Sequence, residues 1–143
     1  MELRRYRAED LPILAHLFGE TVRRVNSRDY APPQVQAWAA GEADLLTRDS
    51  WFQRLYTLVA EADGRIVGYG NVDDTGYLDH LFVRWDCQGQ GIATALCDAL
   101  EAHCRELGVD AVTVHASRTA LPFFLRRGYA VEREQQVPVR GRV

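Results

Sequence analysis

Residues 81–94 read LFVRWDCQGQGIAT and join an expected strand to an expected helix through a glycine-rich turn. The small residues Gly89, Gly91 and Ala93 let the backbone approach a ligand closely. Because the first turn of a helix carries unpaired N–H groups and the positive end of the helix dipole, such a turn can bind phosphate. A plain glycine-rich helix start fits the same letters, and the dinucleotide pattern G-x-G-x-x-G fails at Thr94.

Period-two alternation predicts three strands before this turn, at residues 56–61, 66–72 and 77–83. Short turns containing Asp-Gly and Asp-Thr-Gly connect them, which is typical of an antiparallel meander. After the turn, residues 91–107 place apolar side chains on one helical face, and Gly108 ends the helix.

The flanking segments complete one domain over residues 1–143. The expected N-terminal elements are a strand at 3–7, a helix from 10 to about 25, a polar loop at 26–33, a helix at 33–40 and a short helix at 49–55. The expected C-terminal elements are a strand at 111–116, a helix at 120–127 and a strand at 129–139. This order predicts an α/β fold with a mixed sheet.

Composition restricts the class of protein. The chain has 143 residues and a mass of 16.2 kDa, with 47% apolar and 26% charged residues, as expected for one soluble globular domain. Its net charge of −3 disfavours nucleic acid as a partner. No apolar run approaches the roughly 20 residues of a membrane span, and the N-terminus lacks the apolar segment of a secretory signal. We therefore expect a cytoplasmic protein with no membrane partner.

Lysine and cysteine usage excludes further chemistry. All 17 basic residues are arginine, which rules out a lysine Schiff base and a Walker-type lysine. Cys97 and Cys104 lie about 10 Å apart along one expected helix, too far for a disulfide. The cysteines and histidines show no zinc-ligand spacing, so no metal is expected. Cys87, beside a helix N-terminus, remains an alternative nucleophile.

The turn resembles motif A of the GNAT superfamily of acetyl-CoA-dependent N-acetyltransferases, [R/Q]-x-x-G-x-[G/A]. Gln88, Gly91 and Ala93 occupy its three defining positions. The order of elements is also similar over nearly the whole chain. A polar-Tyr-x-Pro loop at residues 29–32 resembles a small bacterial branch of uncharacterised members.

The resemblance implies a GNAT fold with an antiparallel N-terminal meander, a motif A βα unit and helices on both faces of the sheet. It also implies direct transfer of an acetyl group from acetyl-CoA to a primary amine in a ternary complex. The acceptor stays open among polyamines, aminoglycosides, amino acids and protein N-termini, so a small molecule or a peptide fits. A non-catalytic acyl-CoA-binding module of the same fold is the alternative.

The resemblance also implies a set of cofactor-binding residues. The backbone N–H groups that would hold the pyrophosphate belong to Gln88, Gly89, Gln90, Gly91, Ile92, Ala93 and Thr94. Phe82 and Val83, at a bulge where two strands separate, would bond the pantetheine through their backbone, and the Val83 N–H would polarise the thioester. Ser117 replaces the family's Asn, and Phe124 replaces the Tyr that is its usual general acid.

The catalytic candidates lie on the strand at residues 77–83. Alternation predicts Tyr77, Asp79 and Leu81 on one face, and Leu78, His80 and Phe82 on the other. His80 is an attractive base at neutral pH, yet the family positions favour Asp79 as the group that removes the amine proton. Tyr77 and Tyr30 are the tyrosines that could replace the missing acid.

The remaining expectations concern the acceptor pocket and the end of the chain. The pocket would be formed by the loop at 26–33 and the next helix, with Tyr30, Trp38 and Trp51 as lining candidates. GNAT folds usually end with one more strand after the strand at 129–139. That strand is absent, lies after Val143, or comes from a partner chain, and the last alternative is compatible with a homodimer.

Overall fold

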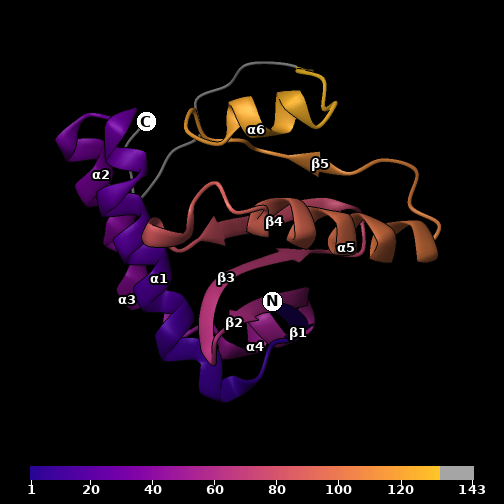
Figure 1. Cartoon of the computed structure of the whole chain (residues 1–143), viewed down its shortest axis with the longest axis horizontal. Coiled ribbons are helices and arrows are strands. Elements are labelled where there is room, and N and C mark those ends of the chain that lie inside the picture. The colour runs from indigo at the N-terminus through magenta and orange to yellow at the C-terminus, as the bar shows by residue number, and fades with distance from the viewer. Residues whose placement is uncertain (133–143) are drawn as a thin grey trace.

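The structure is a computed structural model that describes residues 1–132. Its strands form one five-stranded sheet in the order β1-β2-β3-β4-β5 (Figure 1). The strands are β1 (Glu2–Arg5), β2 (Tyr56–Ala62), β3 (Arg65–Val72), β4 (Tyr77–Val83) and β5 (Thr113–Val114). The first four pair antiparallel and β5 pairs parallel to β4, which confirms the predicted α/β fold with a mixed sheet.

The helices agree with the predictions in order but not in every bound. They are α1 (Leu11–Arg24), α2 (Pro32–Ala39), α3 (Gly41–Leu45), α4 (Asp49–Arg54), α5 (Ile92–Glu106) and α6 (Leu121–Arg126), with short 3₁₀ turns η1 (Ala8–Asp10), η2 (Asn26–Arg28) and η3 (Trp85–Cys87). Helix α3 was not predicted, because five residues are too few for a helical period to be recognised in the sequence.

The C-terminal strands differ most from the predictions. Only two residues of the strand expected at 111–116 pair as β5. Residues 129–132, the described part of the strand expected at 129–139, form no strand. The rest of that strand lies outside the described residues.

The hairpin between β2 and β3 has the turn that its sequence predicts. Asp63 and Gly64 have φ angles of 53° and 75°. Both central residues of a type I′ turn need a positive φ, which Asp-Gly accommodates at low cost. The β2–β3–β4 meander is therefore confirmed.

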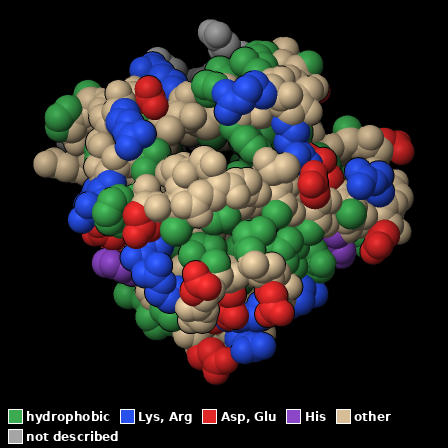
Figure 2. Space-filling view, viewed as in Figure 1, with side chains coloured by type: hydrophobic (Ala, Val, Ile, Leu, Met, Phe, Trp, Pro, Cys, Tyr) green, Lys and Arg blue, Asp and Glu red, His purple; other side chains and the backbone are tan. Residues whose placement is uncertain are grey.

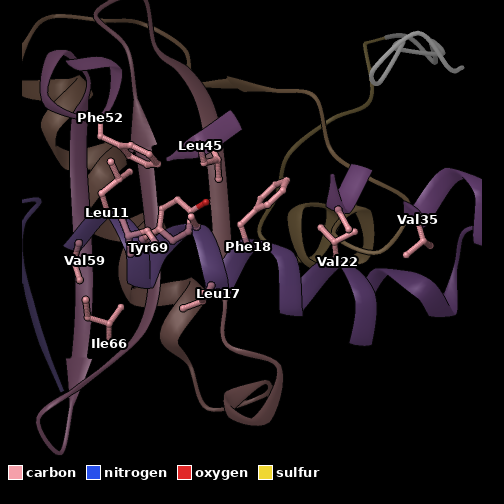
Figure 3. Packing of buried hydrophobic residues seen from close by; sticks show 13 residues of the cluster. Leu11, Leu17, Phe18, Val22, Val35, Leu45, Phe52, Val59, Ile66 and Tyr69 are labelled. Carbon is pink, nitrogen blue, oxygen red and sulfur yellow. The ribbon is translucent and has the colours of Figure 1, made fainter. Parts of the chain in front are cut away.

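Two apolar layers cover the sheet, one on each face. On one face, α1 and α4 cover the fully enclosed side chains of Phe52, Val59 and Tyr69 (Figure 3). The other face is covered by α5 (Figure 1). Its Leu96 and Leu100 are 0% and 1% exposed. The predicted helices on both faces of the sheet are confirmed. Burial of apolar side chains such as these is the main favourable contribution to the stability of a domain of this kind.

The pairing of β4 with β3 is interrupted by one extra residue in β4. The register of β4 against β3 shifts between Leu78 and His80, so that Asp79 forms a β-bulge. The prediction of a bulge at residues 82–83 is wrong, because pairing with β3 continues regularly there.

The bulge also changes which side chains share a face. Leu78 packs under α5 and is 1% exposed. His80 and Phe82 pack toward α1, with ring centroids 5.8 and 5.1 Å from that of Phe18. Strict alternation would place all three of these β4 side chains together, so the predicted position of Leu78 is wrong.

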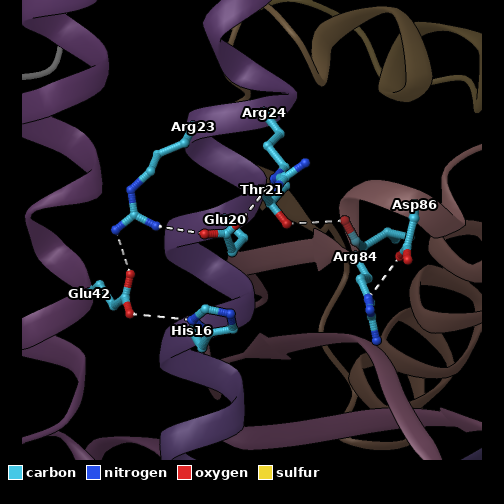
Figure 4. Close-up of polar contacts among 9 residues, drawn as sticks. His16, Glu20, Thr21, Arg23, Arg24, Glu42, Arg84 and Asp86 are labelled. Carbon is cyan, nitrogen blue, oxygen red and sulfur yellow. Dashed lines mark hydrogen bonds and ion pairs between the residues drawn. The ribbon is translucent and has the colours of Figure 1, made fainter.

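Helix α1 is attached to the end of β4 by a buried hydrogen bond. The Thr21 hydroxyl donates to the backbone oxygen of Val83 at 3.3 Å (Figure 4). On the outer side of α1, Arg23 pairs with Glu42 of α3 at 2.7 Å. Exposed ion pairs of this kind contribute little to stability, so the buried bond and the apolar contacts fix α1.

Candidate functional site

A cleft opens where β4 and β5 separate. The two strands pair only at Tyr77–Thr113 and Leu78–Val114, and the bulge at Asp79 follows at once. The cleft has a volume of about 770 Å³. It is lined on one side by α1, η2 and α2, and on the other by the start of α5, the segment after β5, and α6. Figure 2 shows charges of both signs interspersed on the face that carries α5 and α6.

The motif A turn brings glycine backbone to this cleft. Gly89 and Gly91 have φ angles of 74° and 81°, and a Cβ at either residue would meet open space. Gly91 is the N-cap of the fifteen-residue α5 and has no side chain to cap its first N–H groups. The cleft is lined by Gln88, Gly89, Gly91, Ile92, Ala93 and Thr94, which the sequence placed there, but not by Gln90.

Gln88 has a structural role that the motif does not reveal. Its side-chain Nε2 donates to the backbone oxygen of Val83 at 2.7 Å. This bond ties the turn to the end of β4. The backbone N–H groups of the turn are therefore held against the strand that forms the cleft.

The backbone of β4 presents alternate residues to the cleft. The Arg84 N–H donates to the backbone oxygen of Val67 at 2.8 Å. In an antiparallel ladder such pairs alternate, so Phe82 bonds β3 while Leu81 and Val83 direct their N–H groups away from it. The Val83 oxygen already accepts hydrogen bonds from Thr21 and Gln88. The Val83 N–H, which points away from β3, is the backbone group of this residue that can donate to a ligand. Because the Phe82 backbone bonds β3, it does not offer the hydrogen bonds to the pantetheine that were predicted for it, although Phe82 is among the residues that line the cleft.

The opposite wall holds an unpaired polar atom. Thr119 lines the cleft, and its buried Oγ1 has no hydrogen-bond partner among the described residues. A ligand with a hydrogen-bonding group would satisfy it. Ser117 also lines the cleft, with its Oγ accepting the Ala120 N–H at 3.1 Å. The sequence did not point to Thr119 as a cleft residue, because the family positions in this segment correspond to Ser117 and Phe124 only.

Phe124 lies inside this wall and offers no proton. It is 2% exposed and packs against Tyr129, with ring centroids 5.0 Å apart. The Tyr129 hydroxyl donates to Glu101 at 2.6 Å, so it is engaged on α5. The nearby hydroxyl therefore does not replace the tyrosine that Phe124 lacks.

Asp79 is the carboxylate at the closed end of the cleft. It is exposed and lines the cleft just after the last β4–β5 pair. Desolvation raises the pKa of Asp79, the charge of Asp73 raises it further, and His115 and Arg48 offset part of the rise. A carboxylate with a raised pKa is a better proton acceptor than an ordinary one.

His80 lines the cleft within an aromatic cluster. Its Nδ1 lies 3.0 Å from the Tyr69 hydroxyl, and its ring centroid is 5.0 Å from that of Trp51. Burial lowers the pKa of His80 to about 4. The imidazole is therefore neutral near pH 7 and a weaker base than an ordinary histidine.

The two candidate tyrosines lie at different places. Tyr77 is absent from the cleft lining and packs on His115, and burial raises its pKa. The Tyr30 hydroxyl accepts the backbone N–H of Arg118 at 2.7 Å and so joins the loop before α2 to the segment after β5. Of the three predicted aromatic lining residues, Trp38 lines the cleft, while Tyr30 and Trp51 lie behind the lining.

Within residues 1–132, no three His, Cys, Asp or Glu side chains gather as metal ligands. In the same part of the chain, no helix has the length and apolarity that crossing a membrane requires.

The sequence matches the acetyltransferase (GNAT) domain over residues 26–141. The chain belongs to the GNAT acetyltransferase family. It is 32% identical to the uncharacterized N-acetyltransferase YafP of Escherichia coli over 144 residues, which covers 99% of this chain and 89% of that protein. This GNAT chain also resembles two solved structures.

The first is a GCN5-related N-acetyltransferase from Rhodopseudomonas palustris, with a TM-score of 0.94 and 31% identity over 98% of this chain and 88% of that one. The second is the PaiA N-acetyltransferase from Thermoplasma acidophilum in complex with coenzyme A. Its TM-score is 0.80, with 19% identity over 94% of this chain and 92% of that one, so this likeness concerns the fold.

Proposed function

We propose that this GNAT protein transfers the acetyl group of acetyl-CoA to a primary amine, which is a small molecule or a peptide, in a direct ternary complex. The observation that carries the proposal is the cleft between β4 and β5, with the uncapped N-terminus of α5 at one end and Asp79 at the other. The coenzyme A complex of the PaiA relative supports the same ligand class for this chain.

The residues present fit acetyl-CoA. The N–H groups that begin α5 suit the pyrophosphate, and Gly91 leaves the approach free of a side chain. The Val83 N–H and the unpaired Thr119 Oγ1 suit the amide and carbonyl groups of the pantetheine arm. Acetyl-CoA supplies an activated acetyl group, and the chain binds and orients it.

Asp79 supplies the base. The amine must lose a proton to attack, and Asp79 accepts that proton directly or through water. A bond forms between the amine nitrogen and the acetyl carbon, the carbon–sulfur bond breaks, and the thiolate leaves. A thiol has a pKa of about 8.5, so the thiolate leaves without obligatory protonation. Tyr30, whose hydroxyl accepts the backbone N–H of Arg118 between Ser117 and Thr119, is the candidate for protonating the thiolate afterwards.

A non-catalytic acyl-CoA-binding module is the second candidate, and the replacement of the acid by Phe124 favours it. Incubation with acetyl-CoA and a panel of amines separates the two, with thiol release and acetylated product measured together. We expect both to appear in equal amounts. Tight binding of acetyl-CoA without any acetylated product would favour the binding module.

A further inference from the structure

The side of the cleft that faces α1 has a composition that restricts the acceptor amine. We define the α1-side wall as Phe18, Thr21, Val25, Asn26 and Trp38, all of which line the cleft. None of these side chains is charged. Among all described residues that line the cleft, Asp79 is the one carboxylate, and the lining arginines belong to α6 and its end.

Asn26 is the unusual member of this wall. It is 5% exposed, and its side-chain amide forms no hydrogen bond with any residue between 1 and 132. Only its backbone oxygen is engaged, by the Asp29 N–H at 3.0 Å. Neither side-chain atom of this amide is among the fully enclosed polar atoms that lack a partner, so the amide is accessible at the cleft and can bond a ligand group there.

Among residues 1–132, the charges that line the cleft disfavour two of the amine classes that the sequence left open. A polyamine carries a second ammonium group, which needs a second carboxylate in a partly desolvated site. A free amino acid carries a carboxylate, which would meet Asp79 and find no cation on the α1-side wall. Arg48, whose charge acts on Asp79 and His80, does not line the cleft. The His80 imidazole that adjoins this wall is neutral near pH 7, because burial lowers its pKa to about 4.

We propose, on the basis of the proposed function, that the acceptor is a monoamine with an uncharged, ring-sized apolar body that carries a hydrogen-bonding group. The amine lies at Asp79, the body packs against Phe18 and Trp38, and the hydrogen-bonding group meets Asn26. The apolar wall favours the body by excluding water, and Asn26 sets its orientation.

Three pairs of amines test this acceptor class. Tyramine and tyrosine differ by one carboxylate, tyramine and 2-phenylethylamine differ by one hydroxyl, and spermidine adds further ammonium groups. We expect kcat/KM for tyramine to exceed that for tyrosine and spermidine by about 100-fold, because each of these would bury an unpaired charge. The kcat/KM for tyramine should exceed that for 2-phenylethylamine about threefold to tenfold, which corresponds to the free energy of one hydrogen bond.

Asn26→Leu tests the hydrogen bond, because it keeps the size of the side chain and removes the amide. It should make tyramine and 2-phenylethylamine equal substrates and weaken tyramine binding in calorimetry. The matched control is Gln36→Leu, which removes an exposed amide of α2 outside the cleft and should keep the preference. Asn26→Asp adds a second carboxylate and should improve spermidine relative to tyramine.

The possible results separate this inference from the proposed function. Equal or better turnover of spermidine or tyrosine would overturn the acceptor class and leave acetyl transfer intact. An unchanged preference in Asn26→Leu would overturn the role of Asn26. Transfer to a peptide amine but to none of the four amines would overturn the acceptor class alone. Acetyl-CoA binding without transfer to the four amines or to a peptide amine would overturn both proposals.

Discussion

The two sides of the cleft are constructed differently. The side at the start of α5 consists of backbone: the positive-φ glycines Gly89 and Gly91 and the first N–H groups of a helix. The α1-side wall consists of side chains from segments that lie far from motif A in the sequence. Backbone N–H groups are the same in every sequence, so they suit the part of the ligand that is constant. Side chains differ between sequences, so a wall made of them can vary with the acceptor. The same fold can therefore keep one cosubstrate and change the other.

The largest expected effect tests the backbone side. Gly91→Glu should reduce acetyl-CoA affinity about 100-fold or more, because a carboxylate would stand where the pyrophosphate binds. Isothermal calorimetry measures the affinity. Gly108→Glu is the matched control, since Gly108 has a φ of 79°, also faces open space and lies outside the cleft. Both variants should lose about 1 kcal/mol of stability, and unchanged affinity in Gly91→Glu would contradict the phosphate site.

The second effect concerns the residue between the two sides. Asp79→Asn should lower kcat/KM about 100-fold or more near neutral pH, with less loss at high pH where the amine is already unprotonated. Because the pKa of Asp79 is raised, wild-type activity should fall with decreasing pH from a higher pH than an ordinary carboxylate would give. Asp110→Asn removes an exposed carboxylate outside the cleft as a control. A loss that is independent of pH would assign Asp79 a structural role.

A third, smaller effect tests the missing acid. Phe124→Tyr should raise kcat severalfold, since protonation of the thiolate helps a step that already proceeds without it. Steady-state kinetics with tyramine gives the value. Phe123→Tyr, beside it on α6, should show no gain. A properly folded Phe124→Tyr with no gain would indicate that the proton already comes from elsewhere, with Tyr30 next to be tested.

The smallest effect tests how the two sides are joined. Thr21→Val removes the hydroxyl that donates to the Val83 oxygen and should reduce the free energy of unfolding by about 1 kcal/mol. Denaturant unfolding measures it, and Thr21→Ser should restore most of the loss. Acetyl-CoA affinity should change little, because Gln88 still bonds the same oxygen. A large loss of affinity would mean that the two sides do not act separately.

The sequence predicted the backbone side better than the α1-side wall for a physical reason. Glycine spacing, the helix start and the period of the strands are local signals, so motif A, the meander and the order of elements were predictable. A bulge adds one residue without a sequence pattern, which is why the bulge at Asp79 and the face on which Leu78 lies were not predictable.

The acceptor side depends on contacts that the sequence does not encode locally. Trp38 was expected in the pocket because its helix follows the loop at 26–33, but nothing near Asn26 distinguishes it from an ordinary loop residue. Only the packing of α1 against the sheet shows that Asn26 lines the cleft and that its side-chain amide has no partner among the described residues. The same holds for Thr119, whose unpaired hydroxyl depends on how the segment after β5 meets α6.

A crystal structure with coenzyme A would show whether this cleft is the cosubstrate site. We expect the pyrophosphate on the N–H groups of residues 89–94 and the pantetheine between β4 and β5, bonded to the Val83 N–H, with its thiol near Asp79. The α1-side wall should then remain open for the amine. Coenzyme A bound elsewhere, or a pantetheine that lies along the α1-side wall, would show that the two sides of the cleft are wrongly assigned.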